Sequence, residues 1–369
     1  MIFLTNLFIS CCIFQIVYQL VLVISILLKK KNQNFKISNY KSISIIICAK
    51  NEAVNLQKNL SFILEQDYPN FEVIIVDDNS TDNTNEIIKA QQLITKNLYL
   101  ITLSKEEKIG LGKKYALQKG IQAAKSELIL LTDADCQPIS KNWIAEMVNC
   151  ITDNKKIVLG ISPYKTENTF LNALIEYETA QTMLQYIGFA ILGNPYMCVG
   201  RNVLYDKKLL LSKTWTNDEL SIASGDDDLA IQTLATKQNT TVCLSENSYT
   251  FSEAKTTWKS YFNQKIRHNG SGKLYKIRHK LILGSYILSK ILIYTTFFLL
   301  LTWNFKLNVL HLLCVIAYPT ITCMTNMLLN ITLKTQKRWY YSLILDLIYC
   351  FFLLYTGLMS LFIPNQKWK

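Results

Sequence analysis

Two carboxylates end a short apolar stretch in the middle of the chain. Leu128–Leu131 is followed closely by Asp133 and Asp135, which are one residue apart. A continuous apolar run of this length is typical of a strand buried on both faces, as in a parallel sheet. Neighbouring carboxylates repel each other unless positive charge lies near them. A divalent cation with oxygen ligands would supply that charge, so the pair indicates a metal site. The alternative is a polar strand end that enters a turn.

The segments around this pair alternate between strand and helix patterns. Strands are predicted at 42–48, 71–78, 98–103 and 127–135, and helices at 51–69, 79–92 and 112–125. This alternation predicts a doubly wound α/β domain with a mostly parallel sheet, in which ligands bind beyond the carboxyl ends of the strands. Polar residues follow three of these strands: Asn51 and Glu52, Asp77 and Asp78, and the pair at 133 and 135. The sequence therefore predicts one polar site at this edge of the sheet.

Four apolar stretches are each long enough to cross a ~30 Å hydrocarbon core. They are Met1–Leu28, Leu281–Trp303, Leu307–Leu333 and Tyr341–Ile363. Lys290 and Asp346 interrupt the second and the fourth, and such residues usually face protein or water. Helices buried in a soluble domain are the alternative for the last three, and a cleaved leader for the first. The segment 170–193 is also long and apolar, but Glu176 and Glu178 predict that it lies on the domain or at the membrane surface.

The net charge of +12 gathers beside these apolar stretches. Basic residues follow the first stretch at 29–31 and 36, precede the second at 273–280, and lie between the third and fourth at 334–338. Because loops rich in Lys and Arg stay in the cytosol, residues 29–280 are predicted to be cytosolic in a multi-pass protein of the cell membrane. The tail with Lys367 and Lys369 then lies outside, against the rule. Charge at membrane flanks argues against nucleic acid as a partner.

Other chemistries find little support. The ten cysteines form no CxxC pair, and there are only three histidines, so a zinc site is not expected and the thiols are predicted to be reduced. Gly110–Lys114 resembles the start of a phosphate-binding loop, but no Ser or Thr follows the Lys and Glu106 stands where the first Gly should be. No GxSxG elbow is present.

Five motifs in series resemble the membrane-bound, inverting family 2 glycosyltransferases, which have a GT-A fold. They are "SIIICAKNEAVNL", "VIIVDDNSTDNT", "GKKYALQKGIQAAKSELILLTDADC", "SGDDDLAIQ" and "QKIRH". The resemblance covers residues 42–270. It implies a UDP-sugar donor, Mn²⁺ or Mg²⁺, and a carboxylate base.

The resemblance also implies individual roles. The positions that would border the nucleotide are Cys48, Ala49, Glu52, Asp77, Asp78, Lys113, Asp133, Gln264 and Arg267. Among them, Asp78 would accept a hydrogen bond from uracil. Asp135 would be the principal metal ligand, and Asp133 would face the ribose and the metal. Asp77 and Asp78 could instead cap the following helix.

Two further segments match the family with differences. Gln264 and Arg267 fit its QxxRW element, but His268 replaces the Trp. The Arg suits a diphosphate, and a basic helix touching lipid head groups is the alternative. In "VGRNVLY", Gly200 would allow close backbone approach, and Arg201 and Asn202 are candidate site residues.

The catalytic base is predicted within "SGDDDLAIQ", which resembles the family's Glu-Asp motif. Direct displacement at the anomeric carbon needs a carboxylate to take the proton of the acceptor hydroxyl. Matching the acidic pair makes Asp227 the base, whereas matching Leu229 to the apolar residue after the motif makes it Asp226. The alternative is a structural role, because acidic residues are favoured at the N-terminus of a helix.

The sequence thus predicts five regions. They are a membrane helix (1–28), a basic linker (29–41), a cytosolic GT-A domain (42–250), an interfacial helix with the QxxRH element (251–280) and three membrane helices (281–369). The predicted function is transfer of a sugar from a UDP-sugar to a membrane lipid or lipid-linked glycan. A processive polysaccharide synthase, a catalytically silent scaffold and a transporter are the alternatives. The sequence leaves the sugar, the acceptor and the oligomeric state open.

Overall fold

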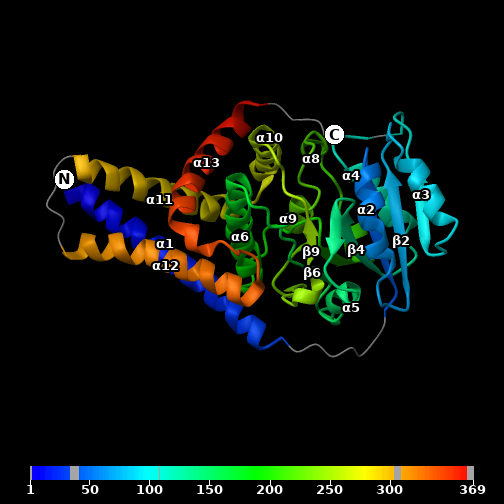
Figure 1. Ribbon diagram of the computed structural model, residues 1–369, viewed down its shortest axis with the longest axis horizontal. Coiled ribbons are helices and arrows are strands. Elements are labelled where there is room, and N and C mark those ends of the chain that lie inside the picture. Colours follow the sequence, from blue (N-terminus) through cyan, green and yellow to red (C-terminus); the bar gives the residue numbers. More distant parts are fainter. Residues whose placement is uncertain (1, 34–40, 108, 303–308, 364–369) are drawn as a thin grey trace.

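The computed structural model describes residues 2–33, 41–107, 109–302 and 309–363. An α/β domain forms one end of the molecule, and long apolar helices project from it at the other end (Figure 1). The two parts are in contact through α6 (Phe170–Ile191) and the last third of α1 (Ile2–Lys31).

The domain is built on a seven-stranded sheet with the order β3-β2-β1-β4-β7-β6-β8. Its strands are β1 (Ile43–Ala49), β2 (Phe71–Asp77), β3 (Leu98–Thr102), β4 (Leu128–Asp133), β6 (Ile157–Leu159), β7 (Val203–Asp206) and β8 (Thr240–Val242). The first four are parallel, which confirms the predicted doubly wound half. β7 runs antiparallel to both β4 and β6, which was not predicted. The sequence of a four-residue strand does not indicate the direction in which it pairs, because its neighbours in the sheet are determined by the rest of the fold.

Helices cover both faces of the sheet. Ile43, Ile45 and Ile47 pack against α2 (Ala53–Leu64) and α5 (Trp143–Val148), with α3 (Thr84–Gln92) beside them. Ile46 points to the other face, towards α4 (Lys114–Ala123) and α6. Since successive strand residues point to opposite faces, burial on both sides explains why β1 is continuously apolar.

The remaining elements are short or lie near the membrane helices. They are β5 (Cys136–Pro138), β9 (Thr250–Ser252), α7 (Lys207–Leu211), α8 (Asn217–Leu220), α9 (Asp228–Leu234), α10 (Trp258–Asn269) and the 3₁₀ turns η1 (Glu246–Ser248), η2 (Gly270–Leu274) and η3 (Trp339–Tyr341). β5 and β9 pair as a separate antiparallel ribbon.

Within the described residues, four helices are long and apolar enough to cross a membrane, as predicted. They are α1, α11 (Ile277–Thr302), α12 (Val309–Leu333) and the stretch that contains η3 and α13 (Ser342–Phe362). The predicted boundaries at Trp303 and Leu307 lie outside the described residues. Lys290 and Asp346 are buried against protein and bonded to each other, as expected for charges in such helices. All ten cysteines are free thiols.

Candidate active site

The carboxyl ends of three parallel strands lie at one level of the sheet. In the strand register, Ala49 of β1 lies beside Asp77 of β2, and Cys48 of β1 lies beside Asp133 of β4. A cavity of about 890 Å³ is lined from this edge by Cys48, Glu52, Asp133 and Asp135. Ligands of doubly wound sheets bind at this position because the connecting loops diverge there.

The cavity gathers most of the predicted site residues from distant parts of the chain. Its lining includes Cys48, Glu52, Lys113, Asp133, Asp135, Gly200, Arg201, Asp226, Asp227, Gln264 and Arg267. Ala49, Asp77, Asp78 and Asn202 are not among the lining residues. The Asn202 side chain instead donates to the backbone oxygens of Ile161 and Ser248, at 2.9 and 2.7 Å, so it fixes neighbouring loops.

Asp77 is engaged by the turn that leads into α3. Its carboxylate accepts hydrogen bonds from the Ser80 backbone N–H at 3.0 Å and from Asn85 Nδ2 at 3.1 Å. Next to it, Asp78 is 1% exposed, and its backbone N–H donates to the Ala49 carbonyl. The bonds of Asp77 fit the capping alternative, and the predicted nucleotide contacts of the pair stay a prediction.

Lys113 joins two groups of carboxylates. Its Nζ lies 2.8 Å from Asp133 Oδ1 and 3.3 Å from Asp226 Oδ2. Burial acts to lower the pKa of Lys113, but Asp133, Asp226 and Asp227 outweigh that effect and hold the pKa well above its usual value. The ammonium group is therefore charged and ties β4 to the acidic segment before α9.

Asp227 occupies the N-cap position of α9. Its Oδ1 accepts from the Asp228 backbone N–H at 2.9 Å, and its Oδ2 accepts from the Gly200 N–H at 2.7 Å. Burial and the charge of Asp226 raise the pKa of Asp227 to about 6, against the opposing charge of Lys113. A Cβ on Gly200 would lie 3.0 Å from Asp227 Oδ2, so the absence of a side chain at Gly200 leaves room for this carboxylate.

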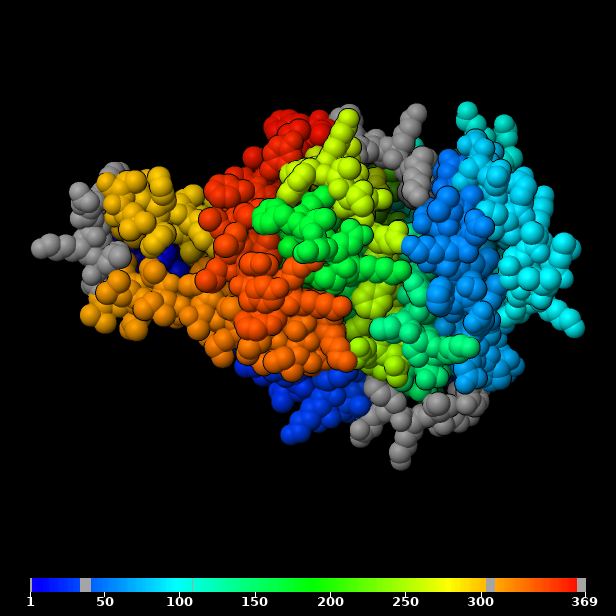
Figure 2. Space-filling view, in the orientation of Figure 1, coloured from blue at the N-terminus to red at the C-terminus, as the bar shows by residue number. Residues whose placement is uncertain are grey.

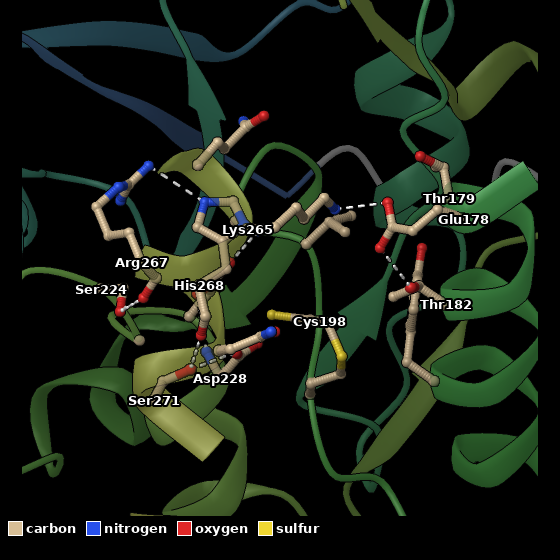
Figure 3. A pocket seen from close by; sticks show the side chains of 18 of the residues that line it. Glu178, Thr179, Thr182, Cys198, Ser224, Asp228, Lys265, Arg267, His268 and Ser271 are labelled. Atoms are coloured by element: carbon tan, nitrogen blue, oxygen red, sulfur yellow. Dashed lines mark hydrogen bonds and ion pairs between the residues drawn. The ribbon is translucent and has the colours of Figure 1, made fainter. Parts of the chain in front are cut away.

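Asp228 has a different environment, at the junction with η2. Its Oδ2 accepts from Tyr275 Oη at 2.6 Å and from Ser271 Oγ at 3.2 Å (Figure 3). Burial and the charge of Asp227 raise its pKa well above the usual range. These bonds link α9 to the chain that enters α11.

Sequence reasoning missed the importance of the loop at 110–114. Lys114 is buried, and its Nζ donates to the carbonyls of Ile222 and Ser224 at 2.8 and 2.6 Å. Gly112 has φ +76°, and a Cβ there would lie 2.3 Å from the Ala223 carbonyl oxygen. The two glycines of this loop and Lys114 were considered only as parts of a phosphate-binding loop. They instead hold the segment that precedes the three aspartates Asp226, Asp227 and Asp228, the acidic triplet.

α10 brings Gln264 and Arg267 to the cavity. The Arg267 carbonyl accepts from Ser224 Oγ at 2.7 Å, and Arg267 Nη2 lies 3.2 Å from His268 Nε2 (Figure 3). Desolvation by the surrounding protein, followed by the charge of Arg267, lowers the pKa of His268 below its usual value although the side chain is exposed, so the imidazole is neutral at pH 7. His268 therefore replaces the aromatic Trp of the motif without adding charge beside the Arg.

The carboxylates at 133 and 135 suit a cation. Burial and the charge of Asp133 raise the pKa of Asp135, and the nearby Arg201 only partly offsets this. Arg201 is itself bonded to Ser252 Oγ at 2.6 Å and to the Ser162 carbonyl at 2.9 Å. Within the described ranges, no group of three or more His, Cys, Asp or Glu side chains is arranged around one metal position. The protein would thus supply two carboxylate ligands to a metal ion and leave the other coordination positions of that ion to a bound substrate or water.

Comparison with known proteins fits this geometry. Residues 44–211 match the model of glycosyl transferase family 2, and residues 128–363 match that of glycosyl transferase family group 2. The second match covers more than half of the chain. The chain therefore belongs to the family 2 glycosyltransferases.

Similar solved structures and curated relatives are also glycosyltransferases. A mannosyltransferase from Pyrobaculum calidifontis, in complex with GDP-Man and Mn²⁺, has a TM-score of 0.60 at 16% identity over 95% of this chain and 99% of that one, which shows the GT-A fold. The 4,4'-diaponeurosporenoate glycosyltransferase of Staphylococcus aureus is 28% identical over 177 residues, and glycosyltransferase AglE of Haloferax volcanii is 31% identical over 120. These segments cover 48% and 32% of this chain, but only 41% and 38% of those proteins.

The contact between Gly200 and Asp227 gives a first prediction. Gly200→Ala should place a methyl group 3.0 Å from Asp227 Oδ2 and displace the carboxylate. A shift of the carboxylate by a few tenths of an ångström should lower sugar transfer by roughly tenfold. The rate is measured as nucleoside diphosphate released by the membrane-bound protein, and a thermal melt checks folding. Gly272→Ala is the matched control, because its Cβ would meet nothing within 4 Å. Equal rates for the two variants would contradict the prediction.

Proposed function

We propose that the protein transfers a sugar from a nucleotide-sugar, a UDP-sugar on the motif resemblance, to an acceptor held in the membrane. The reaction takes place at the cytosolic face of the cell membrane. The observation that carries this proposal is the extent of one cavity, which begins at Asp133, Asp135 and Asp227 and reaches residues of α11 and α13.

The far end of the cavity supports a membrane-held acceptor. Leu283, Gly284 and Ile287 of α11 line it on one side, and Leu353 and Gly357 of α13 line it on the other. Cβ atoms on either glycine would meet nothing within 4 Å, so space remains between these helices. Because both helices are apolar enough for a bilayer, an acceptor with an apolar chain can remain in lipid while its polar end enters the cavity. Lipids and lipid-linked glycans have this form.

The sheet end of the cavity supports a nucleoside diphosphate donor. Asp133 and Asp135 would hold Mn²⁺ or Mg²⁺, which supplies positive charge to the diphosphate as it leaves. The P. calidifontis mannosyltransferase contains Mn²⁺ with its nucleotide-sugar, which supports the same arrangement here. Lys113 and Arg267 line the same cavity and add fixed positive charge near the leaving group.

Asp227 is proposed as the base. The acceptor hydroxyl gives its proton to the carboxylate as its oxygen bonds to the anomeric carbon, and the bond from that carbon to the diphosphate breaks. A pKa of about 6 makes Asp227 more basic than an ordinary Asp while it remains ionised at neutral pH. Asp226 is paired with Lys113 and is the alternative base in the other motif register.

The donor site predicts dependence on metal. EDTA should abolish transfer, and Mn²⁺ or Mg²⁺ should restore it, because the diphosphate leaves poorly without a cation. Asp135→Asn should lose transfer with normal expression and membrane insertion. Asp153→Asn, at an exposed position, is the control and should keep full activity. Full transfer by the wild-type protein in EDTA would refute the metal site.

The base predicts a pH profile. Asp227 must be deprotonated to act, so kcat/KM should be constant above its pKa and fall about tenfold per pH unit as the pH drops below about 6. Asp227→Asn should cut turnover by roughly a hundredfold or more and remove this limb, while UDP affinity stays nearly unchanged. If Asp226→Asn abolishes transfer and Asp227→Asn does not, the register is shifted by one residue.

The opening between α11 and α13 predicts a selective effect on the acceptor. Gly357→Leu fills open space and favours helix, so the fold should tolerate it. Transfer to the membrane acceptor should fall at least tenfold, whereas hydrolysis of the nucleotide-sugar by water and donor affinity should stay unchanged. Leu358→Phe, at the exposed neighbouring position, is the control. A parallel loss of hydrolysis and transfer would show that this end of the cavity does not admit the acceptor.

A further inference from the structure

Among the described residues, three of the four long apolar helices run side by side as a bundle, and the fourth packs across α11 and α12. α1, α11 and α12 leave the α/β domain side by side, whereas α13 crosses them steeply at the base of the bundle (Figure 1). In the space-filling view, α11 and α12 dominate the narrow end, and α13 covers the wider part next to the domain (Figure 2). This arrangement bears on how each helix meets the membrane.

The first turns of α13 are held at the junction between the bundle and the domain. Asp346 accepts hydrogen bonds from Tyr177 of α6 at 2.5 Å and from Tyr318 of α12 at 2.6 Å, and it is paired with Lys290 of α11. Just before η3, Arg338 donates to the Thr169 carbonyl at 3.3 Å, at the N-cap of α6. The chain therefore enters α13 from the side of the domain.

The last turn of α13 also lies beside the domain. Ser360 and Ile363 line a second cavity, of about 250 Å³, together with Asp218, Ile266 and Lys273. These partners belong to α8, α10 and η2. A helix of 21 residues is about 31 Å long, so one that crossed the bilayer would end at the far side, beside the last residues of α11. Both ends of α13 are instead on the same side.

One stripe of α13 faces outward, and it is apolar. The exposed large side chains recur at helical spacing: Leu343, Ile344, Leu347, Phe351, Leu354, Tyr355, Leu358, Leu361 and Phe362. The opposite face packs on protein, and Phe352 stacks on Tyr261 of α10 with ring centroids 5.1 Å apart. An outward stripe of this kind can contact acyl chains along the whole length of α13, and the positions of its two ends decide how the helix lies.

We propose that α13 lies along the cytosolic surface of the bilayer and does not cross it. Its outward stripe contacts the acyl chains of the cytosolic leaflet, and α1, α11 and α12 are the three membrane spans. The segment 364–369, with Lys367 and Lys369, then lies on the same side as the other basic segments. This removes the conflict with the positive-inside rule that four spans create. If the proposed function holds, Leu353 and Gly357 place this surface helix as one wall of the acceptor opening.

A sidedness experiment tests the proposal without reference to activity. Single cysteines are placed at Asn83, which is exposed on the α/β domain, at Asn304, between α11 and α12 in sequence, and after Lys369. An impermeant maleimide is applied to sealed membranes before and after permeabilisation, with the wild-type chain as background. The added C-terminal cysteine should react under the same condition as Asn83→Cys. Reaction under the condition that labels Asn304→Cys would overturn the proposal.

A depth measurement gives an independent readout. Nitroxides are attached at Leu347→Cys, Leu354→Cys and Leu361→Cys, all on the outward stripe, and their immersion depths are measured in vesicles. A spanning helix changes depth by about 20 Å between the first and last of these positions. The surface helix should change by less than half of that, and a larger change would overturn the proposal. Loss of transfer with the surface orientation intact would instead point to a failure of the proposed function alone.

Discussion

The Lys113 ammonium group bridges the two halves of the candidate site. It lies 2.8 Å from Asp133 and 3.3 Å from Asp226, which come from distant segments of the chain. Without it, the carboxylates of β4 and of the segment before α9 would repel each other in a partly buried space. Burial, followed by the charges of Asp133 and Asp226 respectively, still raises the pKa values of Asp135 and Asp227, and Lys113 only partly offsets the rise at Asp227. A cation at the first carboxylate and a transferred proton at the second are the chemistry that this residual negative charge favours.

The same site is fixed relative to the membrane by the core of the domain. Leu22, Val23 and Ile26 of α1 pack in the same hydrophobic cluster as α4 and α6, so the first membrane helix is part of the domain interior. On the other side, Asp228 is tied by Tyr275 and Ser271 to the chain entering α11. The carboxylates therefore cannot move far from the opening between α11 and α13, which suits a reaction in which one substrate stays in lipid.

The sequence was sufficient where local pattern decides the structure. The buried strands β1, β2 and β4 are largely apolar runs, and the polar residues at their ends could be placed at one edge because parallel strands share direction. Features set by long-range packing were not predictable in this way. The antiparallel course of β7, the bonds of Lys114 to Ile222 and Ser224, and the path of α13 each depend on partners far away in the chain. For α13 in particular, length and hydropathy are the same for a surface helix and for a span.

In the proposed mechanism, the acceptor and the leaving diphosphate lie on opposite sides of the anomeric carbon, with a carboxylate of Asp226, Asp227 or Asp228 beside the acceptor hydroxyl. The anomeric configuration of the product tests this most directly. The protein in native membranes is supplied with a panel of α-linked nucleotide-sugars carrying ¹³C at the anomeric carbon, and the lipid-soluble product is examined by NMR. A single displacement predicts a β-linked product, with its one-bond C–H coupling distinct from that of the donor. An α-linked product would contradict the account.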